Sequence, residues 1–406
     1  MTLWSGRVGS RLAPEVWAFL KADDAELLPY DIAATRQHAG RLHAAGLLTD
    51  DELAEVSEKL AALTPEDLDP SDEDVHSAIE RLLGPVGRKT HAGRSRNDQV
   101  AAAFRLFVED ACREAVESIV RLARAVLDRA EGDARTPMPG YTHLQRASPV
   151  TVGHHLLAWV EMLERDLARF RFAGAQAAPS PLGAGALAGS TLPLPPPSAA
   201  QVRNSLDAVS DRDFALDYLY ACAACQSHLS RIGEELCLWA TSEFAYVRLP
   251  ERAATGSSMM PQKLNPDVAE LARAKAGTAL GRLAGLLAVL KGLPLAYDRD
   301  LQEDKQPVFS ARRELRAALA ALGVLVGEMT FDRGRLTAAT ADPLLLATDA
   351  AEELVRNGVP FRDAHEQVAG EVREGAFEAP AAGFRPAPGP GGVHEALAAA
   401  RDRWST

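Results

Sequence analysis

The sequence predicts an all-α protein whose centre is a bundle of long helices. Apolar residues recur every three or four positions over runs of about 20 residues or more, and no segment alternates convincingly between apolar and polar residues. Apolar residues make up 47% and charged residues 25% of the 406, the balance of an ordinary globular protein. Since helices this long exceed the usual length of about 11–12 residues, we expect them to bury one another.

The predicted elements follow one another in a simple order. Residues 1–95 contain short helices only, and residues 101–130 place apolar side chains at 104, 108, 111, 115, 119, 122 and 126, on one face of a helix. The same period predicts further helices over 152–172, 205–241, 266–290 and 310–329. The segment 179–197 is too rich in glycine and proline for a helix and predicts a loop; 379–392 predicts a linker before a terminal helix at 393–404.

Charge and hydropathy disfavour two classes of partner. Lysine plus arginine number 44 against 56 aspartate plus glutamate, a net charge of −12, which disfavours sequence-independent binding to nucleic acid or to anionic lipid. The apolar run 283–290 (LAGLLAVL) ends at Lys291, whereas a membrane span needs about 20 residues. The first residues, MTLWSGRVGSRL, lack the apolar region of a signal peptide, so we expect a cytoplasmic protein.

The four cysteines are Cys112, Cys222, Cys225 and Cys237. Cys222 and Cys225 form a CxxC, which in another context would suggest a metal or redox site. They lie inside a predicted helix, however, and no second Cys or His pair follows at zinc spacing. We therefore favour buried, reduced thiols packed on a helix.

Three polar segments that contain glycine interrupt the helical pattern, and the first is HAGRSRNDQ at residues 91–99. It places Ser95, Arg96 and Asn97 immediately before a long helix. Arginine side chains beside free backbone N–H groups suit a carboxylate ligand. A helix cap with surface charges explains the same residues, because Ser, Asn and Asp all cap helices well.

The second segment is MPGYTHLQR at residues 138–146. His143 lies in a turn with Thr142 and Gln145 beside it, and a histidine in such a position suits general acid or base catalysis. A structural histidine is the alternative. The neighbouring His154 and His155 are interpreted as residues at the start of a helix.

The third segment is GSSMMPQKLNPD at residues 256–267, which cannot be helical before Pro266. It brings Lys263 and Asn265 within a few residues of Ser257. A cation and an amide donor near a hydroxyl can stabilise a developing oxyanion and favour a reactive serine. A polar surface loop is the alternative. The chain has no nucleophile elbow, Walker loop or dinucleotide fingerprint.

Together these segments carry a family resemblance. The third segment resembles the signature loop of the fumarase/aspartase superfamily of lyases, and the whole set resembles the argininosuccinate lyases, with similarity from near the start to about residue 370. The further matching segments are LWSGR (3–7), NSLDAVSDRDF (204–214), YDRDLQEDK (297–305) and LLATDAAEELVRNGVPFRDAH (345–365).

The resemblance implies elimination chemistry that breaks a C–N bond and releases fumarate. It assigns Ser257 as the base, Lys263 and Asn265 as the clamp on the carboxylate that accumulates charge, and His143 as the proton donor or its relay. Glu270 falls at the family's position for a carboxylate that pairs with this histidine. The implied substrate-binding residues are Ser95, Arg96, Asn97, Thr142, Arg212, Asn265, Tyr297, Gln302 and Lys305.

The resemblance also implies an architecture. It predicts a three-domain fold with an N-terminal domain (1–95), a central bundle (96–337) that carries the catalytic loop 254–267, and a shortened C-terminal domain (338–406). Members of the family form homotetramers in which each site combines segments from three subunits. Neither a metal nor an organic cofactor is expected.

Some positions depart from the family pattern. Residues 19–24 (FLKADD) stand where the family usually has a serine-bearing segment that helps to hold substrate, and Ala92 replaces a usual threonine. The first departure concerns contacts on the amine side of the substrate, and the second removes one hydroxyl beside the carboxylate site. Both leave the catalytic residues intact. Two alternatives therefore stay open: a related lyase that releases fumarate from another N-substituted aspartate, and a non-catalytic structural homologue of the kind found among lens crystallins. The intact Ser257, His143 and Lys263 count against the second.

Overall fold

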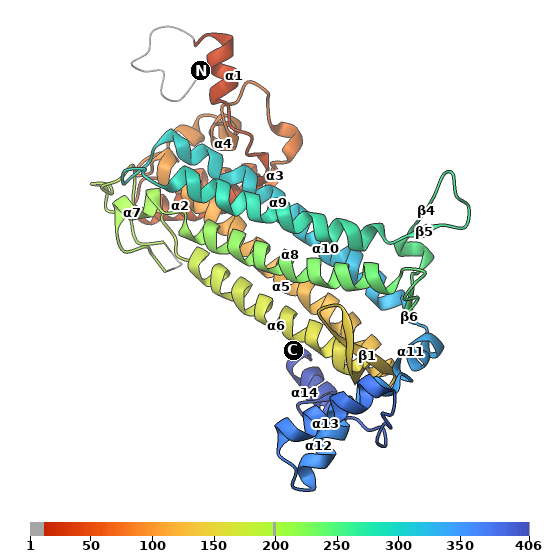
Figure 1. The fold of residues 1–406 in the computed structure, drawn as a ribbon. Helices are drawn as coiled ribbons and strands as arrows, with labels where there is room; N and C mark the ends of the chain where they lie inside the picture. Colours follow the sequence, from red (N-terminus) through yellow and green to blue (C-terminus); the bar gives the residue numbers. More distant parts are fainter. Residues whose placement is uncertain (1–11, 198–199, 406) are drawn as a thin grey trace. The chain divides into compact units, whose positions relative to one another are not determined.

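The protein was analysed as a computed structural model, which describes residues 12–197 and 200–405. Helices dominate these residues, which confirms the predicted all-α class (Figure 1). The matching segment LWSGR at residues 3–7 lies outside the described residues. No described helix is both long and apolar enough to reach across a lipid bilayer.

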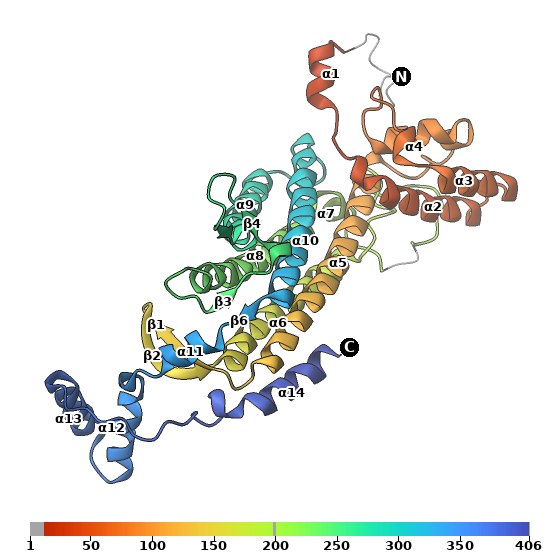
Figure 2. The same cartoon turned by 90° about the vertical axis from the view of Figure 1, so that its right-hand side faces the viewer.

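Five long helices form the centre of the fold and run side by side in both views (Figures 1 and 2). Four of them confirm helices predicted from the apolar period, and the fifth covers part of the helix predicted over 205–241. They are α5 (Arg96–Gly132), α6 (Val152–Ala177), α8 (Asp213–Trp239), α9 (Asp267–Leu290) and α10 (Lys305–Glu328).

The chain divides into two compact units, and each long helix contributes residues to both. The first unit comprises Met1–Val116, Ala168–Ala224 and Gly277–Leu315; the second comprises Glu117–Leu167, Cys225–Ala276 and Arg316–Thr406. The division into three domains stays a prediction.

The first unit joins one part of the bundle to the short N-terminal helices. Phe104 of α5 meets Phe214 of α8 edge to face, with ring centroids 5.4 Å apart. Arg312 of α10 pairs with Asp110 and Glu114 of α5 at 2.9 and 2.7 Å. The shorter helices here are α1 (Pro14–Leu20), α2 (Leu28–Ala44), α3 (Asp50–Ala62), α4 (Val75–Leu83) and α7 (Ser205–Ser210).

The second unit joins the other part of the bundle to small antiparallel strand pairs and the C-terminal helices. Trp159 of α6 stacks on Trp239 of α8, with ring centroids 5.5 Å apart. The strand pairs are β1 (Pro137–Thr142) with β2 (Gln145–Thr151), β3 (Val247–Arg248) with β6 (Thr330–Phe331), and β4 (Thr255–Gly256) with β5 (Leu264–Asn265). The helices here are α11 (Arg333–Thr340), α12 (Ala347–Arg356), α13 (Phe361–Glu374) and α14 (Val393–Trp404).

The prediction of a single helix over 205–241 is wrong, because the structure has two helices there, α7 and α8. Asp211 adopts an extended backbone conformation, and its carboxylate accepts a hydrogen bond from the backbone N–H of Asp213 at 2.7 Å. An aspartate that caps the next helix in this way competes with continued helical hydrogen bonding. The apolar period continues through the break and therefore does not show it.

The β1–β2 hairpin is absent from the elements that the sequence predicts. Its strands contain Pro137, Pro139 and Pro149, which interrupt any alternation of apolar and polar residues and remove backbone donors. His143 and Leu144 form its two-residue turn, so the prediction that His143 lies in a turn is confirmed.

The glycine- and proline-rich segments are loops, as predicted, and the helix after the second one spans residues 393–404. This helix, α14, is bound to the bundle in the second unit. Arg401 pairs with Glu131 at 2.6 Å, Arg403 pairs with Glu164 at 2.9 Å, and Arg124 donates to the carbonyl oxygen of the buried Trp404. Cys222 and Cys225 are buried thiols on α8, as expected.

Candidate active site

The segment at the start of α5 is built around one buried carboxylate. The Oδ1 atom of Asp98 accepts the backbone N–H of Ser95 at 2.9 Å. Its Oδ2 atom accepts the backbone N–H groups of Gly183 and Gly185 at 3.1 and 3.0 Å. Asp98 therefore fixes the turn that presents Ser95, Arg96 and Asn97 and joins it to the 183–185 loop. The two interpretations of this segment are compatible, because capping groups shape the turn while Arg96 and Asn97 face a pocket.

A pocket of about 340 Å³ lies in the first unit next to this turn. Two segments that are distant in sequence carry the predicted substrate-binding residues of its wall. They are the turn at 95–97 and residues 297–305, which supply Tyr297, Gln302 and Lys305. Six of the predicted substrate-binding residues thus come together here. The remaining lining residues are Ala22, Asp24, Glu73, Asp74, His91, Val100 and Arg299.

The charges around this pocket are mixed. Arg96 Nε lies 3.5 Å from the Asp74 carboxylate, and Arg299 pairs with Glu73 at 3.0 Å. Burial tends to raise the pKa of Asp74, but Arg96, His76 and the hydrogen bonds from Ser77 together outweigh burial, and the net pKa is lowered. Burial raises the pKa of Asp24. The wall can therefore accommodate a ligand that carries both anionic and cationic groups.

A buried ion cluster supports the pocket from behind. The Asp304 carboxylate accepts hydrogen bonds from the guanidinium of Arg212 and from Lys305 Nζ, the latter at 2.7 Å. All three side chains are almost completely buried. Two cations against one carboxylate leave an excess positive charge, which favours an anion near Lys305. Arg212 itself does not line the pocket, and its direct contact with substrate stays a prediction.

Gln302 is already engaged by the protein. Its side-chain amide donates to the carbonyl oxygen of Leu20 at 3.2 Å. Arg299 donates to the same oxygen at 2.9 Å. The segment that departs from the family pattern, residues 19–24, is thus held at the pocket by its backbone.

In the second unit, the turn of the β1–β2 hairpin exposes Thr142 and His143 to solvent. His143 and Leu144 have φ angles of 54° and 56°, in the left-handed region that L-residues rarely adopt. The turn requires positive φ at both positions, which is typical of two-residue hairpin connections.

The signature loop lies between β4 and β5, where Thr255 pairs with Asn265 and Gly256 with Leu264. Ser257 Oγ accepts the backbone N–H groups of Met259 and Met260 at 3.2 and 3.0 Å. Two such donors stabilise negative charge on a serine oxygen. Lys263 is exposed and forms no ion pair with any described carboxylate.

The second-unit candidates do not form a connected set within one chain. Among residues 12–197 and 200–405, no hydrogen bond or ion pair joins the side chains of His143, Ser257, Lys263 and Glu270. Glu270 is exposed near the start of α9, and its predicted pairing with His143 stays untested. No group of three His, Cys, Asp or Glu side chains gathers at metal-binding distance in the described residues.

Sequence reasoning missed Asp98 and Asp304 as residues that hold the site. Both residues stand next to residues of the predicted site in the sequence. The sequence did not indicate the role of Asp98, because its partners Gly183 and Gly185 lie more than 80 residues away. The same holds for Asp304 and Arg212.

Known families and relatives match most of the chain. A family model described as lyase matches residues 37–281, and one described as argininosuccinate lyase C-terminal matches residues 344–379. An argininosuccinate lyase of Frankia casuarinae is 52% identical over 388 residues, covering 91% of this chain and 83% of the relative.

Two solved structures show the same fold. The crystal structure of EDDS lyase in complex with formate has a TM-score of 0.80 at 28% identity and covers 98% of this chain and 91% of its own. A class II fumarase from Schistosoma mansoni has a TM-score of 0.76 at 14% identity, with coverage of 87% and 86%; at that identity the likeness concerns the fold alone.

Proposed function

The chain belongs to the argininosuccinate lyases, and we propose that it cleaves argininosuccinate into fumarate and L-arginine. The observation that carries the proposal is the pocket of the first unit, where six residues predicted to bind substrate converge from two segments about 200 residues apart. Its mixed charges suit argininosuccinate, which carries carboxylates together with a guanidinium and an ammonium group.

In the proposed reaction, Ser257 removes a proton from the carbon next to the one that bears the departing nitrogen. The electron pair of that C–H bond moves into the adjacent carboxylate and then forms the double bond of fumarate as the C–N bond breaks. The two backbone N–H groups that reach Ser257 Oγ support this role, because they favour the alkoxide needed for proton abstraction.

Lys263 and Asn265 are proposed to hold the carboxylate that gains charge during the reaction. Both follow Ser257 on the same loop, and Lys263 carries an exposed charge without a described carboxylate partner. His143 would give a proton to the departing nitrogen, directly or through a relay, with Glu270 as its carboxylate partner. The exposed position of His143 in its turn suits contact with a substrate.

We infer that the protein assembles as a homotetramer with shared sites. Gly277, Gly281 and Gly285 follow one another at intervals of four on α9, and a methyl group added at any of them would meet no atom within 4 Å apart from its chain neighbours and the nearby backbone of its own helix. Leu280 and Leu287 on the same helix are about half exposed. An apolar face with small residues suits close packing against a helix of another subunit. A site completed by other subunits also agrees with the separation of His143 and Ser257 within one chain.

The first test mixes purified protein with argininosuccinate and follows the ultraviolet absorbance of fumarate's conjugated double bond. A rising signal with arginine among the products supports the proposal. Ser257→Ala should abolish turnover while binding stays measurable by calorimetry, because the substitution removes the base and leaves the binding groups. Near-normal turnover in that variant would disprove the assigned role. If the folded tetramer causes no rise in absorbance, the substrate would instead be assigned as another N-substituted aspartate.

A second test addresses the shared site. Inactive His143→Ala and Ser257→Ala proteins are mixed under conditions that allow subunits to exchange. Some mixed tetramers then contain sites in which both segments are intact, so partial activity should return. No recovery after exchange has been verified by mass spectrometry would contradict shared sites.

A further inference from the structure

The turn that carries His143 belongs to a small region of unusual backbone conformation. Four non-glycine residues among those described have positive φ: His143, Leu144, Ala245 and Ala296. His143 and Leu144 lie two and three residues after Tyr141, and Ala245 directly precedes Tyr246. Such conformations persist only where the surrounding structure holds them, and they concentrate at functional sites.

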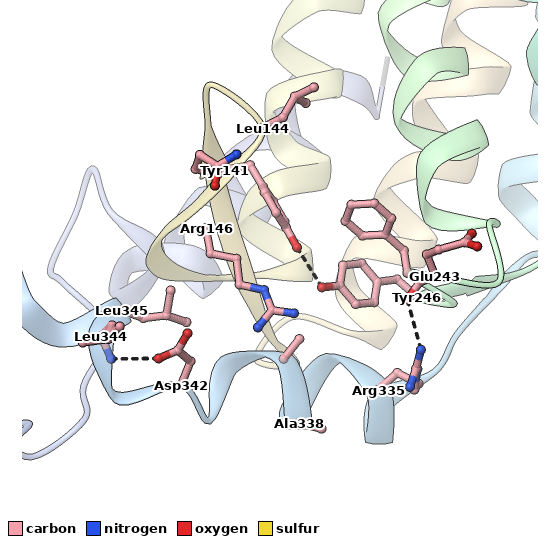
Figure 3. A pocket seen from close by; sticks show the side chains of 13 residues that line it. Tyr141, Leu144, Arg146, Glu243, Tyr246, Arg335, Ala338, Asp342, Leu344 and Leu345 are labelled. Atoms are coloured by element: carbon pink, nitrogen blue, oxygen red, sulfur yellow. Dashed lines mark hydrogen bonds between the residues drawn. The ribbon is translucent and has the colours of Figure 1, made fainter. Parts of the chain in front are cut away.

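The strands of the hairpin supply only part of this support. Prolines at 137, 139 and 149 remove backbone donors from the ladder, and the register shifts at Gly140, between Pro139 and Tyr141. An open pocket of about 800 Å³ lies between the hairpin, the 243–246 segment and α11 (Figure 3). The face of the hairpin near the turn is therefore not packed against a continuous core.

A hydrogen bond between two tyrosines ties the hairpin to a fixed part of the second unit. The hydroxyl groups of Tyr141 and Tyr246 lie 2.8 Å apart and point toward each other (Figure 3). Tyr141 stands two residues before His143. Its ring also meets Phe244 edge to face, with centroids 5.9 Å apart.

Tyr246 is a rigid anchor for this bond. Its residue is 3% exposed, its backbone N–H donates to Trp239 at 2.9 Å, and its carbonyl oxygen accepts the N–H of Asp332 at 2.8 Å. Burial and the neighbouring Tyr141 hydroxyl raise the pKa of Tyr246 to about 12, so its hydroxyl stays protonated at neutral pH.

We propose that Tyr246 is a positioning residue for His143, and that its hydrogen bond to Tyr141 fixes the left-handed turn in which His143 meets the substrate. This inference rests on the proposed catalytic role of His143. Tyr246 lies outside every motif that carries the family resemblance. Loss of the bond would leave the binding pocket of the first unit unchanged but would let the turn sample other conformations. Thr142 is the one implied binding residue beside this turn, so KM should change little and the main expected effect is on kcat.

The test compares Tyr246→Phe, Tyr141→Phe and the double variant in the assembled protein. Each single change removes the same neutral hydrogen bond and keeps the ring, so each should lower kcat by about three- to tenfold and leave KM within about twofold. The double variant should be no slower than either single variant, because the bond can be lost only once. Tyr218→Phe is the matched control: it removes the hydroxyl of a fully buried tyrosine on α8, and its kcat should be unchanged.

Amide hydrogen exchange of residues 137–151 gives a readout that does not depend on activity. Exchange in this hairpin should become faster in all three variants and stay unchanged in Tyr218→Phe. Additive losses in the double variant, an effect on KM alone, or unchanged hairpin exchange would each overturn the inference. If the buried Tyr246→Phe protein fails to fold, the less buried Tyr141→Phe tests the same bond. If the wild-type protein does not act on argininosuccinate, the proposed function fails, while hairpin exchange still decides whether the bond fixes the turn.

Discussion

Asp304 is expected to be the most sensitive charged residue behind the binding pocket. Its carboxylate lies between Arg212 and Lys305, and the side chains of Asp304 and Arg212 are completely buried. Asp304→Asn keeps the shape of the side chain but removes the only negative charge of this cluster. Two cations then remain together in a largely buried region.

The size of the effect follows from this burial. Removal of one partner of a buried ion pair costs about 3–5 kcal/mol, mainly because the other charge is left uncompensated. Asp304→Asn should therefore lower the free energy of unfolding by about that amount. At a urea dependence of roughly 3 kcal/mol per M, the unfolding midpoint should fall by about 1 M or more. Midpoints must be measured at one protein concentration, since assembly contributes to the stability of an oligomer.

Two further variants separate this explanation from a general effect of the substitution. Glu328→Gln removes one partner of an exposed pair with Arg252, whose side chain is 77% exposed, and should cost less than about 1 kcal/mol. Adding Arg212→Met to Asp304→Asn removes one of the stranded cations and should restore part of the lost stability. Equal midpoints for Asp304→Asn and Glu328→Gln, or no recovery in the double variant, would show that uncompensated buried charge is not the cause of the destabilisation.

Three other predictions follow from the same kind of argument. Asp98→Ala removes the acceptor of three backbone N–H groups, and each such group costs roughly 1–3 kcal/mol when it is buried and unpaired. The variant should therefore lose at least about 3 kcal/mol of unfolding free energy, measured in urea, and its KM should rise. Burial lowers the pKa of His38 to about 3 from an ordinary 6.5, so the unfolded chain binds the proton first and stability should fall as the pH drops from about 6.5 toward 3. His38→Gln should flatten that dependence, and an unchanged slope would exclude His38 as its source. Leu280→Arg places a charge on the exposed face of α9 and should shift sedimentation from tetramer to smaller species; an intact tetramer would show that this face is not an interface.

The sequence predicted the bundle well because helices of this length are determined by their own apolar period. The period places each end of α5, α6, α9 and α10 within five residues of its observed position. It did not show the break at Asp211, where a side-chain cap overrides a pattern that continues on both sides. It also did not show the β1–β2 hairpin, whose residues pair only because a two-residue turn brings them together.

The site was predictable in its residue types and only partly in its geometry. Sequence motifs on separate segments indicate Ser95, Arg96 and Lys305 as binding residues, and these side chains do line one pocket. The groups that hold them were hidden, because a buried carboxylate such as Asp98 is recognised by its distant partners and not by its neighbours in sequence. The contribution of Tyr246 depends in the same way on a contact across 105 residues.

The attachment of α14 has a practical consequence for handling the protein. The linker before it, around residues 376–389, is largely without regular structure, while Trp404 is buried and Arg401 and Arg403 pair with glutamates of α5 and α6. A protease that cuts this linker would break the chain without releasing its last helix. Such a sample would elute from a sizing column like intact protein and separate into two fragments only in a denaturing gel. A purification tag fused to the C-terminus would then report the capture of the whole molecule even after the covalent connection had been lost.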